Sequence, residues 1–254
     1  MLGSAAIMRW LSVLSIFAFG CLAVTVGLAF GYAPVAQLSA GGLTQKIFYV
    51  HVPSAYVMYI GVTACVAGSV GYLAQRTPGW DALAQAGAEL GVLFAGIVLV
   101  TGPLWARKAW GTYWTWDPRL TTTLLGALIF VSYLVLRGGA GSGEAEKRFS
   151  AALAVMGACV MPVIHYSVQL WRGQHPTVIT SRGGGLAPAM AHTLTLSFLA
   201  FTLLAAVLLT LRSRVAMQRS KLEALRTRAR GVHPGRAAAR GVHRLHARRA
   251  GGAR

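Results

Sequence analysis

Charged residues are scarce in this sequence. Of its 254 residues only 12% are charged and six are acidic, whereas 55% are hydrophobic. A soluble domain has about 25% charged residues, so the composition argues against an ordinary soluble domain and favours a chain solvated by lipid. The formal net charge of +18 does not contradict this, because thirteen of the 24 basic residues lie between Arg212 and Arg254.

Several reactive motifs are also missing. Cys21, Cys65 and Cys159 lie in apolar runs without a C-x-x-C or C-x-x-C-H spacing, which argues against thiol redox chemistry and covalent haem attachment. The three glycines at 183–185 lack the lysine and the preceding strand of a phosphate-binding loop. No pairing of a nucleophile with a base is recognisable. We therefore predict a binding protein, not an enzyme, in which any energy for transport comes from a partner.

The hydrophobic pattern predicts an all-α integral membrane protein with six transmembrane helices. A membrane-spanning helix needs about 20 mainly apolar residues, and six segments qualify. The first is longer than the roughly 7–15 apolar residues of a signal peptide, so we expect it to be retained. Gly102-Pro103 and Gly138-Gly139 predict the ends of the third and fourth. The predicted helices are Leu11–Tyr32, Pro53–Ala74, Ala84–Leu104, Thr121–Leu136 (with a first turn from Pro118), Phe149–Leu170 and Leu186–Leu211.

The basic residues decide the predicted orientation, because cytoplasmic connections carry an excess of Lys and Arg. Without the tail, the helix ends carry five basic residues on the N-terminal side and six on the other, which gives no preference. The thirteen basic residues of the tail add to the count on the N-terminal side, so we predict that both termini lie in the cytoplasm. We divide the chain into a six-helix membrane domain, residues 1–211, and a basic, disordered cytoplasmic tail, residues 212–254. We expect the tail to contact anionic lipid and not nucleic acid.

Three connections must share one face of the membrane, whichever way the chain is oriented. With six helices these are the first, third and fifth, at about residues 33–52, 105–120 and 171–185. The third reads WARKAWGTYWTWDPRLT from residue 105 and holds four of the seven tryptophans. An aromatic belt at the membrane interface would spread such residues over several helix ends. Their concentration in one connection indicates a binding surface.

The tryptophan-rich connection also suggests its own structure. If residues 110–117 are helical, their spacing places four side chains on one face of the helix. These are Trp110, Tyr113, Trp114 and Asp117. That face would form a flat aromatic surface along the membrane. Asp117 followed by Pro118 is typical of the N-cap and first residue of a helix, so we expect Asp117 to cap the fourth helix.

Two histidines flank this connection. His51 is predicted just before the second helix, and His175 about one turn beyond the fifth. A large flat ligand with a central metal and peripheral carboxylates would use imidazoles as iron ligands, aromatic rings against its plane and arginines at its propionates. Haem is the obvious candidate, although histidines near a membrane are often only polar interface residues. The surrounding basic residues are Arg107, Lys108, Arg119, Arg172 and Arg182.

Three separate segments resemble the haem-handling membrane proteins. WGTYWTWDPRLT, residues 110–121, is similar to their tryptophan-rich signature. KIFYVHVP, residues 46–53, and PVIHYSVQLWRGQH, residues 162–175, resemble the flanking histidine motifs of the haem exporter protein C family. The resemblance covers about residues 10–211 and the six-helix layout. The haem lyase subunits and single-chain synthases that share the signature are longer and have more helices.

The resemblance implies a site and a function. His51 and His175 would be the axial ligands of a non-covalent, b-type haem. The protein would present this haem at the outer face of the bacterial cytoplasmic membrane and load a periplasmic haem chaperone during cytochrome c-type biogenesis. Its partners would be ABC transporter subunits and a small membrane subunit. The residues expected to hold the porphyrin are Trp110, Tyr113, Trp114, Trp116, Asp117, Arg119, Trp171 and Arg172.

Two other functions remain open at this stage. A b-type electron carrier would hold haem inside the bundle, and of the histidines within predicted helices only His165 and His192 could serve. A permease subunit of a haem or solute exporter would need a polar path, for which the helices offer little beyond these two and Glu89. For each of the three residues a structural role, in hydrogen bonding or packing, is the simpler expectation.

Overall fold

The computed structural model describes residues 4–139, 143–176 and 185–231. The described helices are α1 (Ser4–Gly31), α2 (Phe48–Gln75), α3 (Pro78–Ala109), α4 (Pro118–Gly139), α5 (Glu144–Ala158), α6 (Val160–Trp171) and α7 (Pro188–Gly231), with short 3₁₀ helices η1 (Leu38–Ala40) and η2 (Gly42–Ile47) before α2. The chain divides into two compact units, Met1–Ala216 and Met217–Arg254.

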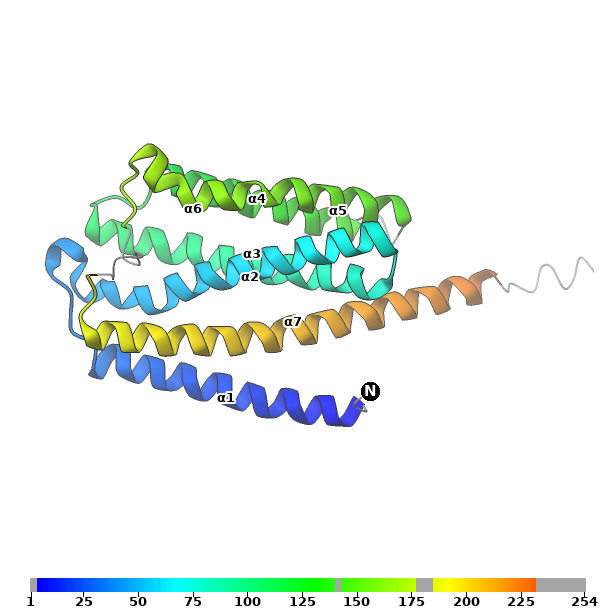
Figure 1. Cartoon of the computed structure of the whole chain (residues 1–254), viewed down its shortest axis with the longest axis horizontal. Helices are drawn as coiled ribbons and strands as arrows, with labels where there is room; N and C mark the ends of the chain where they lie inside the picture. Colours follow the sequence, from blue (N-terminus) through cyan, green and yellow to red (C-terminus); the bar gives the residue numbers. More distant parts are fainter. Residues whose placement is uncertain (1–3, 140–142, 177–184, 232–254) are drawn as a thin grey trace, which may run out of the picture. The chain divides into compact units, whose positions relative to one another are not determined.

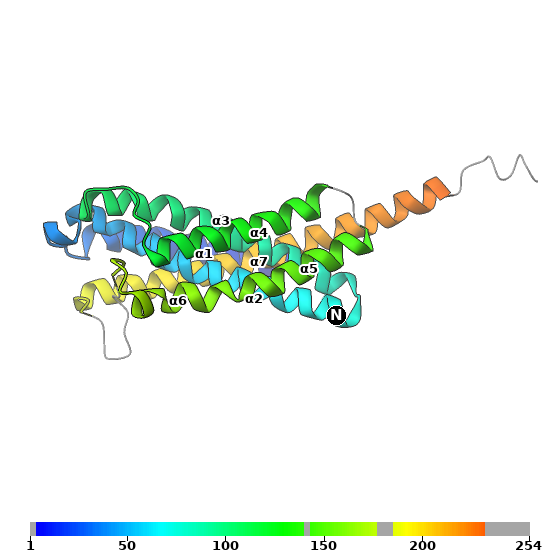
Figure 2. The same cartoon turned by 90° about the horizontal axis from the view of Figure 1, so that it is seen from above.

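Six segments of the described residues are long and apolar enough to cross a membrane, which confirms the all-α, six-helix prediction. The fifth of them combines α5 and α6, which follow one another in line (Figure 2). The two helices meet at Cys159. Pro162 lies just beyond and cannot donate to the carbonyl of Ala158, which accounts for a break at this point.

The close contact between α2 and α3 is made by small residues. A Cβ added to Gly87 would lie 2.3 Å from the backbone nitrogen of Cys65, and one added to Gly61 would lie 2.4 Å from that of Gly91. Gly87 and Gly91 form a G-x-x-x-G pair, the spacing that lets membrane helices approach each other most closely. Any side chain larger than hydrogen at Gly61 or Gly87 would push the two backbones apart.

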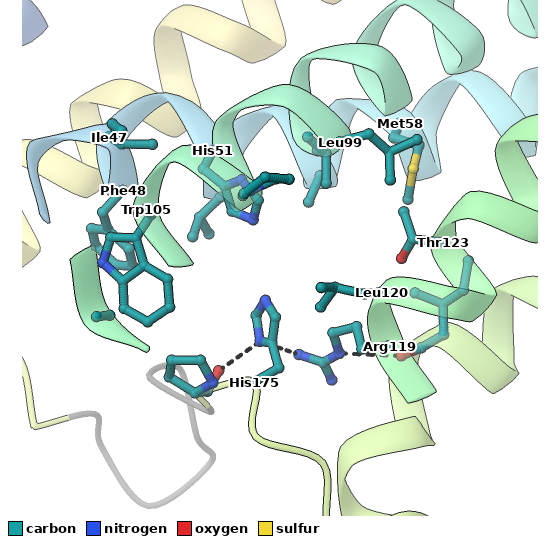
Figure 3. A pocket seen from close by; sticks show the side chains of 18 of the residues that line it. Ile47, Phe48, His51, Met58, Leu99, Trp105, Arg119, Leu120, Thr123 and His175 are labelled. Carbon is teal, nitrogen blue, oxygen red and sulfur yellow. Dashed lines mark hydrogen bonds between the residues drawn. The ribbon is translucent and has the colours of Figure 1, made fainter. Parts of the chain in front are cut away.

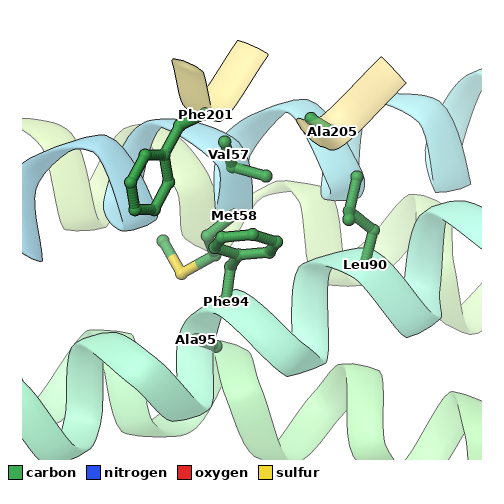
Figure 4. Close-up of a cluster of buried hydrophobic side chains, with 7 residues drawn as sticks. All are labelled: Val57, Met58, Leu90, Phe94, Ala95, Phe201 and Ala205. Carbon is green, nitrogen blue, oxygen red and sulfur yellow. The ribbon is translucent and has the colours of Figure 1, made fainter. Parts of the chain in front are cut away.

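Large apolar side chains pack around this helix pair. Figure 4 shows one buried cluster, to which α2, α3 and α7 all contribute. In it the rings of Phe94 and Phe201 meet edge to face with centroids 6.0 Å apart. Glu89 of α3 pairs with Arg212 of α7, which agrees with the structural role expected for Glu89. The cluster consists of Val57, Met58, Leu90, Phe94, Ala95, Phe201 and Ala205.

Buried charges join the helices at the end where α3 begins. Asp81 accepts a hydrogen bond from Arg137 of α4 at 2.8 Å, and Lys147 of α5 lies 3.5 Å from the same carboxylate oxygen. The connections after α1 and α3 and the segment after α6 lie at the opposite end (at left in Figure 1). The functional residues predicted in those connections therefore gather at one end of the first unit.

The start of α2 corrects the prediction that His51 precedes the second helix. The helix begins at Phe48, so His51 lies in its first turn, and Pro53 lies inside the helix. Proline lacks the amide hydrogen that the carbonyl of Tyr49 would otherwise accept. Ser197 of α7 donates its hydroxyl hydrogen to that carbonyl instead. This contact satisfies the freed carbonyl and ties the His51 turn to α7.

Two other helices run further than predicted. Gly102-Pro103 does not end α3, which continues to Ala109; it stops where Gly111 takes a φ of 78°, a conformation that favours glycine. The last helix was expected to end at Leu211, with a disordered tail after it, but α7 continues to Gly231. Residues 212–231 include six Arg and three Ala, which favour helices. The remainder of the tail, 232–254, lies outside the described residues.

We expect Gly87→Ala to destabilise the fold, because its methyl group would overlap the α2 backbone. Overpacking of this kind costs about 1–3 kcal/mol. Unfolding of the purified protein in detergent, followed by circular dichroism, would measure the change. The matched control is Gly96→Ala on the same helix, where an added Cβ meets nothing within 4 Å. Equal stability of the two variants would contradict the glycine-mediated contact.

Candidate functional site

A cavity of about 580 Å³ lies at the end where the predicted functional connections gather. Its walls come from η2, α2, α3, α4 and α6, together with the segments that follow α3 and α6 (Figure 3). They are mainly apolar and aromatic with a few polar groups. Both the volume and this lining are typical of sites that bind a small organic ligand, whose cavities measure about 300–1,000 Å³.

His51 and His175 face each other across this cavity. Their ring centroids are 6.4 Å apart and their planes are inclined by 29°. His51 comes from the first turn of α2, and His175 from the segment after α6 (Figure 3). The structure therefore brings together two residues separated by most of the membrane domain. The Nδ1 atom of each ring contacts a protein group, which leaves the Nε2 atoms available to a ligand.

His175 is held in its neutral form. Burial, and to a smaller extent the positive charge of Arg119, lower the pKa of His175 to about 4. Its Nδ1 lies 3.1 Å from the carbonyl oxygen of Pro176 and 3.3 Å from Nη1 of Arg119. These contacts require opposite tautomers, since a carbonyl only accepts and a guanidinium only donates. The tautomer that donates to Pro176 leaves Nε2 with the lone pair that a metal needs.

Arg119 forms part of the cavity wall and joins three segments. It lies in the first turn of α4, and its Nη2 donates to the carbonyl of His165 at 2.8 Å. Its Nε donates to the carbonyl of Ile164 at 3.3 Å, and Nη1 reaches His175. The guanidinium thus holds α6 and the His175 segment against α4. It also brings a positive charge to the cavity, where it could pair with a carboxylate of a ligand.

Three tryptophans line the cavity. Trp105 and Trp110 meet edge to face with centroids 5.2 Å apart, and Trp114 adds a third ring. Trp105 donates from Nε1 to the side-chain oxygen of Gln45 in η2 at 2.7 Å, which fixes the ring against the cavity. Sequence reasoning did not include Trp105 in the site, although its place in the tryptophan-rich string was a signal that could have found it.

The segment between α3 and α4 corrects the predicted aromatic face. Residues 110–117 are not helical, so Trp110, Tyr113, Trp114 and Asp117 do not share one side of a helix. The positive φ of Gly111 ends the helical path, and the chain continues without regular structure to the cap of α4. Tyr113 is 57% exposed and therefore lies on the surface, while Trp110 and Trp114 reach the cavity.

Asp117 connects the two segments that meet at the cavity. One carboxylate oxygen accepts the backbone N–H of Arg119 at 2.9 Å, which confirms the predicted N-cap. The other accepts the N–H of Gln174 at 2.6 Å. A Cβ at Gly173 would lie 2.4 Å from that oxygen, so glycine is needed for the close approach. Asp117 is buried and fixes the backbone just before His175.

The cavity takes in some of the predicted residues and leaves out others. Among the described residues that line it are His51, His175, Trp110, Trp114 and Arg119. Not among them are Tyr113, Trp116, Asp117, Trp171 and Arg172. Arg172 forms the left-handed C-cap of α6, with φ 51°. His165, the ligand candidate of the electron-carrier alternative, also lines the cavity. Lining residues with polar or aromatic side chains that the sequence did not single out include Gln45, Phe48, Tyr59, Trp105 and Gln169.

The two histidines within the helices are not brought together. His165 lines the cavity, with its ring against the edge of Tyr166. His192 instead contacts Tyr32, the residue after α1, with 3.2 Å between Nδ1 and the phenol oxygen. His192 is therefore a packing residue, as expected. In the part of the chain that the structure describes, no group of three or more His, Cys, Asp or Glu residues could enclose a metal ion.

These features define a class of protein: a polytopic membrane protein with a ligand cavity at one end, between two facing histidines. Sequence comparison is more specific. The sequence model of one family, heme exporter protein C, matches residues 3–228. The chain belongs to this family.

Individual relatives agree with the family match. Heme exporter protein C of Bradyrhizobium diazoefficiens is 37% identical over 166 residues, which cover 64% of this chain and 63% of the relative. This chain thus spans less than two thirds of that protein. The protein of the same name from Escherichia coli (strain K12) is 34% identical over 208 residues, 81% of each chain. That of Paracoccus denitrificans is 30% identical over 229 residues, 89% of this chain and 92% of the relative.

Asp117→Asn is expected to loosen the His175 segment. An amide has only one oxygen, so it cannot accept from both Arg119 and Gln174, and one buried N–H loses its partner at a cost of about 1–3 kcal/mol. Hydrogen exchange measured by mass spectrometry should then be faster around Gln174. The control is Asp81→Asn, which removes a buried carboxylate at the opposite end of the helix bundle. It should leave hydrogen exchange around Gln174 unchanged. Unchanged exchange in Asp117→Asn would show that the carboxylate does not hold this segment.

Proposed function

We propose that this protein binds haem non-covalently between His51 and His175 and passes it on during the maturation of c-type cytochromes. The observation that carries the proposal is the pair of imidazoles that face each other across an aromatic cavity, 6.4 Å between ring centroids. The relatives named heme exporter protein C support the choice of haem over other metal-containing ligands.

The distance between the rings fits one metal ion between them. Two metal–nitrogen bonds of about 2 Å, together with the radii of two imidazole rings, put the centroids about 6 Å apart. The observed centroid separation of 6.4 Å is close to this value. The cysteines agree with non-covalent binding, because Cys21, Cys65 and Cys159 are not among the described residues that line the cavity.

The other lining residues suit the rest of the ligand. Trp105, Trp110 and Trp114 offer rings to the porphyrin plane, where contacts between aromatic groups contribute about 0.5–1.5 kcal/mol each. Arg119 supplies the positive charge for a propionate. The haem is the cargo here, and the side chains of this protein hold and orient it. The function is therefore binding and transfer, not catalysis.

Delivery requires a surface beside the cavity. We name three exposed aromatic residues the aromatic rim: Tyr113, Trp116 and Trp171, which are 57%, 76% and 56% exposed. Tyr113 and Trp116 lie in the segment between α3 and α4, and Trp171 is the last residue of α6, just before the segment that carries His175. In this proposal the rim faces the periplasm and receives the haem chaperone, while both termini lie in the cytoplasm of a bacterial cell. The ABC transporter subunits and the small membrane subunit complete the complex.

The alternative functions gain no support from the geometry. An electron carrier with haem between His165 and His192 would need these rings to face each other, but His192 contacts Tyr32, just after α1. A permease would need a polar path, and Glu89 is paired with Arg212. Among the described residues, neither the His192–Tyr32 contact nor the Glu89–Arg212 pair therefore forms part of a ligand site for these alternatives.

Replacing either cavity histidine should remove the spectrum of a haem with two nitrogen ligands. We expect wild-type protein titrated with ferric haem to give a low-spin visible spectrum. His51→Ala and His175→Ala should each lose it and bind haem at least about tenfold more weakly. His192→Ala is the control and should behave as wild type. Low-spin haem retained in both cavity variants would move the ligands to other residues and overturn the proposal.

Binding and delivery should separate when individual tryptophans are replaced. Trp116→Ala is expected to keep the haem affinity of the wild type, because this exposed ring is outside the cavity, but to slow transfer to the haem chaperone. Trp110→Ala should instead weaken haem binding itself, since its ring lines the cavity. Titration and stopped-flow transfer measure the two effects. Equal transfer rates for wild type and Trp116→Ala would argue against the rim as the delivery surface.

A further inference from the structure

His51 has a hydrogen-bond partner deep in α3 that the sequence did not indicate. Its Nδ1 lies 2.8 Å from the hydroxyl oxygen of Thr101. That hydroxyl oxygen lies 2.7 Å from the carbonyl oxygen of Ile97, one turn earlier in the same helix. Thr101 thus stands between a ring nitrogen and a backbone carbonyl, and it has one hydrogen to give.

The position of that hydrogen follows from the two distances. Two oxygens 2.7 Å apart need a hydrogen between them, because otherwise their lone pairs would repel. A carbonyl has none to offer, so the hydroxyl hydrogen of Thr101 points to Ile97. A lone pair of the hydroxyl then faces His51, and the hydrogen between Thr101 and His51 must belong to Nδ1. The neutral ring consequently carries no hydrogen on Nε2.

We propose that Thr101 is a positioning residue that sets the tautomer of His51, so that Nε2 is free to bind iron. Metal-bound histidines almost always donate their second ring N–H to a protein acceptor, which orients the ring and strengthens its basicity. The inference rests on the proposed function for the haem iron and for its ligation by His51. The tautomer itself follows from the contacts within α2 and α3.

Gly102, next to Thr101, leaves the space that the imidazole of His51 occupies. A Cβ on Gly102 would lie 3.2 Å from Cε1 of His51, closer than side chains normally approach. The hydroxyl at Thr101 and the open space at Gly102 therefore define where the imidazole lies along α3. His175 differs, because its two Nδ1 contacts call for opposite tautomers. His51 is the ligand prepared before haem arrives, and His175 adopts its ligating form on binding.

The tautomer can be measured without haem. In haem-free protein with ¹⁵N-labelled histidine, the His51 signals are assigned as those lost in His51→Ala. At neutral pH we expect a protonated Nδ1 and an unprotonated Nε2. The opposite tautomer, or a mixture of the two, would overturn the inference. Because no haem is present, this result stands even if the protein proves not to bind haem, so the two proposals fail separately.

Substitution tests the consequence for the ligand. We expect Thr101→Val, which keeps the shape of the side chain but removes the hydroxyl, to weaken ferric haem binding about tenfold or more. It should also raise the midpoint potential of the bound haem, because a less basic imidazole stabilises ferric iron less. Thr101→Ser restores the acceptor and should return both quantities to wild-type values.

The matched control is Thr122→Val, whose hydroxyl donates to the carbonyl of Pro118 in its own helix. It should leave affinity and potential unchanged. Wild-type behaviour of Thr101→Val would overturn the inference, as would a Thr101→Ser variant as weak as the Val variant, since packing alone would then explain the loss. If Thr101→Val does not fold, the ¹⁵N measurement on wild-type protein decides.

Discussion

The close packing of α2 on α3 is the constraint on which the site depends. It is possible because glycines of each helix lie against the backbone of the other, at Gly61 and Gly87 in particular. In a membrane, where lipid competes equally for apolar side chains, such small-residue contacts are the main way to bring two helices close. The same helix pair, followed toward the cavity, puts His51 beside Thr101 and Gly102. The position of the first histidine is therefore a consequence of helix packing.

The second histidine is positioned differently. His175 lies outside any helix, and its backbone is held through the carboxylate of Asp117, which caps α4 with one oxygen and binds the N–H of Gln174 with the other. Arg119 adds bonds from α4 to α6. One side of the cavity is thus built on a helix–helix contact, and the other on polar contacts between segments. Local opening of a few hydrogen bonds would affect the second side first, which agrees with the proposal that the site takes up and passes on haem.

Much of this arrangement could be predicted from the sequence. The six apolar segments, the common face of three connections and the cap at Asp117 rest on local composition or on parity, which a single sequence contains. The choice of His51 and His175 as ligands rests on the resemblance of their motifs to those of the haem exporter protein C family. The errors have a shared cause. Pro53 and Gly102-Pro103 were read as helix boundaries because proline disfavours a helix locally, but Ser197, 148 residues beyond Tyr49, satisfies the carbonyl that Pro53 frees. The spacing of residues 110–117 suggested a helix that Gly111 prevents.

The sequence by itself determined that this chain is a membrane protein with an aromatic, histidine-flanked site, because lipid demands long apolar segments and reactive residues stand out among them. Only the tertiary structure decided which tryptophans line the cavity, that Asp117 also holds the His175 segment, and that Thr101 contacts His51. Thr101 is one more hydroxyl in an apolar helix when the sequence is read alone. Its role depends on how α2 and α3 are aligned along their lengths, because this alignment places Thr101 beside His51. The alignment is set by packing contacts between residues far apart in the chain.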